Sequence, residues 1–285
     1  MTKTIGILYL CTGPYRLFWD DFYRTFEANF LPETKKRYFV FCDDLDALEE
    51  SYGDNERVRL IHLATMPWPL ITLLRFRFFL SIEDDLKSCD YLMFSNASIA
   101  CEQAVTEAEF LPRHEAGENM SFVQHPGYWH KPACNAPLER NRKSLAYVPY
   151  NCKTPYVIGA MFAGESDTFL HMSHVLNDRI EADLKKNVIA RWHDESHLNR
   201  YVANRSDCRL LGPDYCYPCG FDLPVERKLI AVDKASKFDV AGFKGMEGKP
   251  ADAKAFLRKA CKKIRSYGYV QRVRDAVLMK RVKEL

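Results

Sequence analysis

The densest group of chemically capable side chains lies in residues 191–201, which read RWHDESHLNRY. Helical spacing from Glu195 onward places Leu198 and Val202 on one face. The polar side chains then gather at the helix start, where the helix dipole favours a carboxylate. A plain capping segment, with Asp194 or Ser196 as the cap, explains the same pattern equally well. The histidines do not have the H-E-x-x-H order of a metalloprotease.

Two other segments contain residues suited to binding a sugar. Residues 124–130 (QHPGYWH) place aromatic rings beside a turn, where they can pack on a sugar ring, and His125 can bond a hydroxyl. Residues 155–164 (PYVIGAMFAG) include small side chains, such as Gly159 and Ala160, that allow a ligand to approach the backbone. Taken singly, a core-packing turn and tight strand packing are the competing interpretations.

The elements that must position these segments alternate between strands and helices in the first hundred residues. Apolar runs predict strands and helical spacing predicts helices, in the order strand 4–11, helix 15–30, strand 37–42, strand 58–62, helix 70–82 and strand 89–95. Such alternation predicts an α/β fold with a largely parallel sheet. Loops 12–15, 43–44 and 96–98 follow strand ends, so all three are expected to face one cleft.

Composition agrees with an ordinary soluble core, and the chain ends in a basic tail. The 285 residues are 47% hydrophobic and 28% charged, with ten scattered cysteines. We expect reduced thiols, no leader peptide and a cytoplasmic protein. Residues 251–285 contain eleven Lys or Arg against three Asp or Glu, with apolar residues at helical spacing. This tail predicts a basic amphipathic helix, either on an anionic inner-membrane surface or docked on domain 1–250. No nucleic-acid-binding motif is visible.

Three motifs, HPGYW, PYVIGAMFAG and WHDESHLNRY, occur in an order and spacing that closely resemble the histo-blood-group A/B and α1,3-galactosyltransferase family, glycosyltransferase family six. The segments IGILYLCTGPYRLFWDDFY and CDYLMFSNAS resemble the first strand with its nucleotide loop and the DxD segment of that family. The resemblance extends from about residue 4 to residue 234. It implies a GT-A fold, a Rossmann-like mixed sheet flanked by helices.

The resemblance also implies roles for individual residues. Glu195 takes the place of the catalytic carboxylate, which can act as a nucleophile or stabilise an oxocarbenium-like centre. Tyr15 matches the residue that stacks on uracil. The implied donor and nucleotide contacts are Cys11, Thr12, Tyr15, Arg75, Asn96, Ala97, Ser98, Ile158, Gly159, Ala160, His193, Asp194 and Lys234. The implied acceptor contacts are His125, Trp129 and Trp192.

One departure from the family concerns the metal. Asn96 and Ser98 stand where vertebrate members have the two aspartates that bind manganese. An amide and a hydroxyl are poor ligands for a hard dication, so we expect no metal and no other cofactor. Arg227, Lys228 or Lys234 must then stabilise the departing UDP, with Lys234 matching the basic residue of the family.

The expected function is retaining α1,3 transfer of galactose or N-acetylgalactosamine from a UDP-sugar to a β-galactoside-type oligosaccharide or glycolipid. The methyl group of Ala160 narrows the donor pocket relative to glycine, which mildly favours galactose. A catalytically weak UDP-sugar-binding or carbohydrate-binding module on the same scaffold is the alternative. Glu195 discriminates between the two, because a pure binder needs no carboxylate there.

Overall fold

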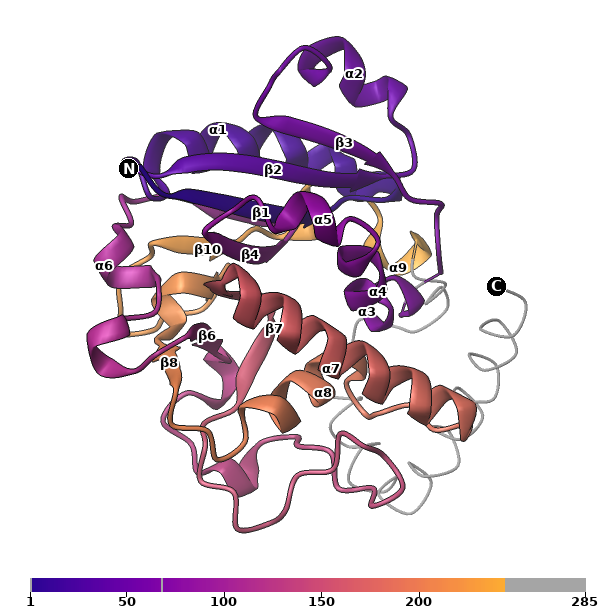
Figure 1. Ribbon diagram of the computed structural model, residues 1–285, viewed down its shortest axis with the longest axis vertical. Helices are drawn as coiled ribbons and strands as arrows, with labels where there is room; N and C mark the ends of the chain where they lie inside the picture. The colour runs from indigo at the N-terminus through magenta and orange to yellow at the C-terminus, as the bar shows by residue number, and fades with distance from the viewer. Residues whose placement is uncertain (1, 68, 244–285) are drawn as a thin grey trace.

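The computed structural model describes residues 2–67 and 69–243. A seven-stranded mixed sheet forms its centre, with strand order β3-β2-β1-β4-β7-β6-β8 (Figure 1). The strands are β1 (Thr4–Leu10), β2 (Lys35–Cys42), β3 (Val58–His62), β4 (Tyr91–Asn96), β6 (Met120–Gln124), β7 (Val157–Glu165) and β8 (Cys208–Leu211). The first four are mutually parallel, whereas β7 is antiparallel to both β4 and β6.

Strand residues alternate between two hydrophobic cores, as the period of two requires. In β1, Ile7 and Tyr9 face the core beneath α1 (Trp19–Asn29), while Leu8 faces the opposite core. Helices α4 (Arg75–Leu80), α7 (Ser166–Lys185) and α8 (His193–Val202) cover that second core. Figure 1 shows α1 on one side of the sheet and α7 with α8 on the other.

A small second sheet, with strand order β5-β10-β9, lies beyond the end of β4. Its strands are β5 (Ile99–Cys101), β9 (Tyr217–Pro218) and β10 (Leu229–Ala231). The amide of Val232 donates to the carbonyl of Ser98 at 2.9 Å. This bond brings residues 232–234 beside the loop that follows β4, although the two segments are far apart in sequence.

The remaining elements are short. The α-helices are α2 (Asp46–Tyr52), α3 (Leu70–Leu73), α5 (Glu83–Leu86), α6 (Glu107–Phe110) and α9 (Val240–Phe243). The 3-10 helices are η1 (Gly13–Phe18), η2 (His114–Ala116), η3 (Pro126–Tyr128), η4 (Ala133–Asn135), η5 (Pro213–Cys216) and η6 (Lys234–Ser236).

The expected α/β class and mixed sheet are confirmed, and they agree with the GT-A fold that the resemblance implies. Two expected helices are each divided. Residues 15–30 form η1 and then α1, because Gly13, with a φ of 60°, and Pro14 start the turn early. Residues 70–82 are interrupted at Leu74, whose φ of −96° and ψ of 9° are not helical. The expected tail, residues 251–285, lies outside the described residues.

The nine cysteines among the described residues are all unpaired, which agrees with the expected reduced thiols. Within the same residues no helix combines the length and the apolar character needed to cross a bilayer.

Candidate active site

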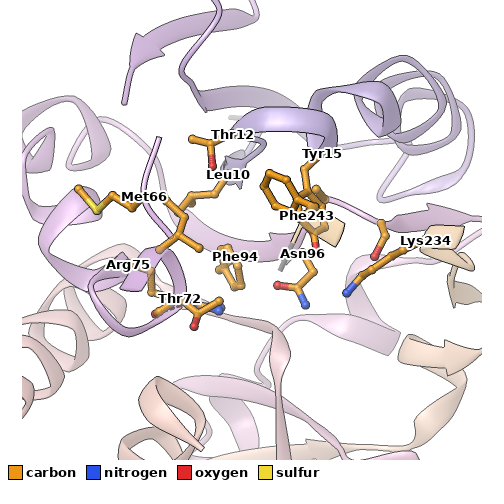
Figure 2. A pocket seen from close by; sticks show the side chains of 13 residues that line it. Leu10, Thr12, Tyr15, Met66, Thr72, Arg75, Phe94, Asn96, Lys234 and Phe243 are labelled. Carbon is orange, nitrogen blue, oxygen red and sulfur yellow. Dashed lines mark hydrogen bonds between the residues drawn. The ribbon is translucent and has the colours of Figure 1, made fainter. Parts of the chain in front are cut away.

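A cavity opens at the carboxyl ends of β1 and β4, where ligands bind in sheets of this kind (Figure 2). Seven of the residues expected to bind the donor line it. The lining residues are Leu10, Thr12, Tyr15, Met66, Ile71, Thr72, Arg75, Phe94, Asn96, Ala97, Ser98, Lys234 and Phe243. Loops 12–15 and 96–98 therefore do meet at one cleft, as their places after strand ends predict.

The loop formed by residues 12–15 is held in place by Asp43, which belongs to the third expected loop, residues 43–44. The amide of Gly13 donates to both carboxylate oxygens of Asp43, at 2.8 and 3.0 Å. Gly13 has a positive φ, and a Cβ atom there would come within 2.9 Å of the Phe243 ring. Glycine is therefore needed at this turn, and Asp43 positions the loop rather than lining the cavity.

Aromatic and basic side chains gather at one side of the cavity. The Lys234 ammonium lies 5.6 Å from the centre of the Tyr15 ring. Phe238 and Phe243 meet the same ring edge-on, with centroid distances of 5.2 and 5.9 Å. Figure 2 shows Tyr15, Asn96 and Lys234 around one open space. A flat aromatic ring beside an ammonium group suits a nucleobase next to phosphate.

Arg75 connects this cavity to the acidic cluster of α8. Its Nε lies 3.1 Å from Oδ2 of Asp194, and its Nη1 donates to the carbonyl of Gly159 at 2.8 Å. Its guanidinium also lies over the Phe94 ring, 4.2 Å from the centroid. Arg75 is buried, so this pairing with Asp194 offsets the cost of removing its charge from water.

Glu195 accepts one hydrogen bond on each carboxylate oxygen. The Tyr156 hydroxyl donates to Oε1 at 2.6 Å, and the amide of Gly159 donates to Oε2 at 2.8 Å. A Cβ atom at Gly159 would come within 3.1 Å of the Glu195 Cβ, so the small residue permits this approach. The orientation of the carboxylate is thus fixed from two sides.

Asn199 fastens α8 to the start of β7. Its Nδ2 donates to the carbonyl of Val157 at 2.8 Å, and its Oδ1 accepts from the Val157 amide at 2.9 Å. The same Nδ2 donates to the carbonyl of Glu195 at 2.9 Å. The side chain therefore bonds the Val157 backbone as a neighbouring strand would. It also links Val157 to the backbone of Glu195.

Burial raises the pKa of both acids in the cluster. It raises the pKa of Asp194 to about 7, against the opposing effect of Arg75. Burial also raises the pKa of Glu195, opposed by the hydrogen bonds from Tyr156 and Gly159 and by Arg75. Perturbed carboxylates beside a cavity are typical of functional sites.

The interpretation of residues 191–201 as only a capping segment does not hold for Asp194. The helix begins at His193, and Trp192 is the N-cap residue. The Ser196 hydroxyl accepts from the Trp192 amide at 2.9 Å, so Ser196 does help to close the helix start. His193 is buried and has a φ of 54°, a left-handed conformation that is uncommon outside glycine.

Of the three residues expected to bind the acceptor, His125 packs beside Tyr156, the hydroxyl donor to Glu195, and Trp192 directly precedes α8. The His125 ring centre is 5.7 Å from that of Tyr156. Burial lowers the pKa of His125, whose Nδ1 accepts from the amide of Gly127 at 3.0 Å. Trp129 is half-buried, and Trp192 is 41% exposed at the start of α8.

Some expected contacts lie elsewhere. Cys11 is fully buried at the end of β1 and does not line the cavity, whereas its neighbours Leu10 and Thr12 do. Arg227 pairs with Glu102 at 3.5 Å, and Lys228 pairs with Glu109 and Glu226. Of the three basic candidates for stabilising UDP, only Lys234 lies at the cavity.

Residues 158–160 lie on β7 beside the acidic cluster rather than on the cavity lining. Ile158 is half-buried and Ala160 is buried, on either side of the Gly159 that bonds both Glu195 and Arg75. Their side chains pack on the core beneath α1, and strand alternation places them on the opposite face of β7 from the Gly159 contact with Glu195.

Sequence reasoning missed Tyr156 and Asn199. Both fall in motifs already singled out, but their partners lie 39 and 42 positions away in sequence. A tyrosine directly before a strand of small residues was the available signal for Tyr156. In residues 2–67 and 69–243, no three His, Cys, Asp or Glu side chains are grouped so that they could hold a metal ion.

Comparisons with known proteins place these features in a family. The model of the family described as glycosyltransferase family 6 matches residues 1–240. The O-antigen biosynthesis glycosyltransferase WbnI of Escherichia coli is 35% identical over 230 residues, covering 81% of this chain and 94% of that protein.

Vertebrate relatives match more distantly. The globoside alpha-1,3-N-acetylgalactosaminyltransferase 1 of Gallus gallus is 27% identical, over 83% of this chain and 68% of that protein. The histo-blood group ABO system transferase 2 of Rattus norvegicus is 24% identical, over 75% of this chain and 63% of that protein.

Proposed function

The chain belongs to glycosyltransferase family 6, and we propose that it transfers galactose or N-acetylgalactosamine from a UDP-sugar to a β-galactoside-type glycan. The proposed linkage is α1,3, and the proposed reaction retains the configuration of the anomeric carbon. The name of the chicken relative, an alpha-1,3-N-acetylgalactosaminyltransferase, supports the sugar class and the linkage.

One observation carries the proposal. Glu195 is held at both oxygens by Tyr156 and Gly159, and Arg75 joins the same Gly159 to the cavity at the strand ends. A carboxylate fixed in this way close to a cavity at the strand ends serves chemistry at the sugar better than it serves packing. A pure binding module has no need of it.

In this proposal Glu195 lies on the β face of the donor sugar. As the bond between the anomeric carbon and the diphosphate breaks, positive charge develops on the ring. The carboxylate either forms a covalent bond to the anomeric carbon or stabilises the charge while the acceptor hydroxyl attacks from the front side. His125, Trp129 and Trp192 bind the acceptor.

The proposed enzyme works without a metal ion. Asn96 and Ser98 line the cavity with an amide and a hydroxyl, which can donate to ribose and diphosphate oxygens. Lys234 supplies positive charge near the departing UDP, where negative charge grows in the transition state. Tyr15 stacks on the uracil ring, and the side chains of His193, Asp194 and Arg75 bind the donor sugar.

Donor choice is proposed to depend on Ile158 and Ala160. Ala160 is 6% exposed, so its methyl group occupies space that a glycine would leave to an N-acetyl group. We therefore expect galactose to be the better substrate, by a modest factor of about 10 or less, because a single methyl group distinguishes ligands only weakly.

The test is product analysis with each donor and a β-galactoside acceptor, with EDTA or with manganese present. An α1,3-linked product formed equally well with EDTA supports the proposal, and the faster donor identifies the preferred sugar. Strict dependence on manganese would refute metal independence. Tight UDP binding without product from either sugar would support the binding-module alternative.

A further inference from the structure

An exposed surface that includes the segment before α8 combines basic and apolar side chains. It is formed by residues 140–150, between β6 and β7, and by residues 185–192, between α7 and α8. We call it the 140/185 surface. In Figure 1 the segment between β6 and β7 runs below α8.

Two buried carboxylates join the halves of this surface. Asp183 accepts from the Ser144 hydroxyl at 2.6 Å and from the Leu145 amide at 2.9 Å. Glu139 accepts from the Arg191 amide at 2.6 Å and from the Asn141 amide at 2.7 Å. Both acids are fully engaged with the protein and are buried, so they face away from solvent.

The basic side chains of the 140/185 surface are exposed to solvent, unlike the two buried acids. Arg142, Lys143, Lys185, Lys186 and Arg191 are exposed, and Arg140 is half-buried. Within residues 140–150 and 185–192 there is no acidic residue at all. Along α7 the next acids are Asp183, which faces inward, and Glu181, which pairs with Arg77. The outward face therefore has a strong positive potential.

Large apolar side chains are exposed on the same segments. Six large hydrophobic side chains of the described residues are exposed, and three of them lie here: Leu145 at 41%, Tyr150 at 71% and Trp192 at 41%. Exposed aromatic and aliphatic side chains among Lys and Arg are typical of surfaces that enter the headgroup region of an anionic bilayer. A nucleic acid offers no comparable apolar environment to Leu145.

We propose that the 140/185 surface docks on an anionic lipid membrane. The bases contact lipid phosphates, and Leu145 and Tyr150 enter the headgroup layer. Trp192 is three positions before Glu195, so docking here holds the acceptor side of the active site at the membrane. An acceptor sugar carried on a lipid would then reach the active site without leaving the surface.

Sedimentation of the full chain with vesicles tests this. Phosphatidylcholine vesicles are compared with and without phosphatidylglycerol. The wild type is expected to bind only the anionic vesicles, and the triple variant R142Q/K143Q/K186Q to bind them about tenfold or more weakly. The matched control R24Q/K35Q/K87Q removes three exposed bases elsewhere and is expected to bind like the wild type.

A second pair of variants tests the apolar part. L145S/Y150S is expected to weaken binding several-fold, and L17S/F221S, which removes exposed apolar side chains elsewhere, is expected to leave it unchanged. Each variant must keep its melting temperature and its transfer rate to a soluble disaccharide. Failure of transfer in the wild type itself would concern the proposed function and not the docking.

Two results would overturn the proposal. One is the absence of wild-type binding to anionic vesicles. The other is wild-type binding by the 140/185 variants, which would assign attachment to another surface, such as residues 251–285.

Discussion

At the scale of single residues, Asp194 and Glu195 are neighbours in the chain but have different partners. Asp194 forms a buried ion pair with Arg75, whereas Glu195 receives neutral donors from Tyr156 and Gly159. In the proposed mechanism Asp194 binds and orients the donor, while Glu195, whose negative charge Arg75 also favours, acts at the anomeric carbon. The two roles follow from the different partners of the two side chains.

Replacing Tyr156 with Phe should move the acid limb of the pH profile upward. The hydroxyl stabilises ionised Glu195, so its loss raises the pKa of that carboxyl further. Activity that needs ionised Glu195 is lost as the pH falls through this raised pKa. We expect kcat/KM at neutral pH to fall about 10- to 100-fold, from the loss of one charge-assisted hydrogen bond.

The pH dependence of kcat/KM provides the measurement. Tyr128→Phe is the matched control, since Tyr128 packs against the Tyr156 ring at 5.4 Å. An unchanged acid limb in Tyr156→Phe would show that the hydroxyl does not control the ionisation of Glu195.

Removing Arg75 should cost stability as well as activity. Arg75→Met leaves the buried Asp194 carboxylate unpaired, and we expect the free energy of unfolding to fall by about 3–5 kcal/mol at pH 8. The double variant Arg75→Met/Asp194→Asn should recover much of this loss, because no uncompensated charge remains. Chemical denaturation measures both.

Arg77→Met, on the exposed side of the same helix, should change stability by less than about 1 kcal/mol. Equal losses in the single and double variants would contradict the ion-pair account of Arg75.

At the scale of elements, the active site depends on how α8 meets β7. Asn199 bonds both polar groups of the Val157 backbone and the carbonyl of Glu195. The helix and the strand that carry Glu195 and Gly159 are thereby joined by one side chain. The divided helix at Leu74 has a similar effect, since Arg75 begins α4 directly after the break and reaches the cavity from there.

Asn199→Leu should loosen this junction. The Val157 amide and carbonyl would lose their partner in a buried position, and we expect the free energy of unfolding to fall by about 2–4 kcal/mol. Asn177→Leu, on the outer part of α7, is the matched control. Near-equal denaturation midpoints for the two variants would show that the junction does not depend on Asn199.

At the scale of the whole molecule, local sequence predicts strands β1 to β4 well, because each is a short apolar run between turns, whereas β6 and β8 were not predicted. The edges of β2, β3 and β4 fall within two residues of expectation. The divided helices were less predictable, because Leu74 carries no helix-breaking chemistry and its backbone angles follow from packing.

For the candidate site, the sequence predicts which residues belong to it but not which partners they contact. Glu195, Arg75, Tyr15 and Lys234 could be named because they lie in motifs that resemble the family. Local charge could not distinguish Lys234 from Arg227 and Lys228, whose acidic partners are recognisable only in three dimensions. The partnership of Tyr156 with Glu195 is equally invisible, because it depends on how far β7 and α8 approach each other.

UDP binding should stabilise the whole molecule equally with and without manganese. The cavity lining offers an amide, hydroxyls and one ammonium group to the diphosphate, so binding needs no dication in this account. At a UDP concentration about 100 times Kd, binding should add about 2.7 kcal/mol to the free energy of unfolding, seen as a higher melting temperature. A rise that appears only with manganese would contradict it.

The most direct test of the central claim compares Glu195→Gln with the wild type in transfer and in UDP binding. Glutamine keeps the size of the side chain and removes its charge. The account predicts that the variant binds UDP like the wild type while its transfer rate falls at least about 1,000-fold. A variant that transfers sugar at near the wild-type rate would show that Glu195 is not the catalytic carboxylate.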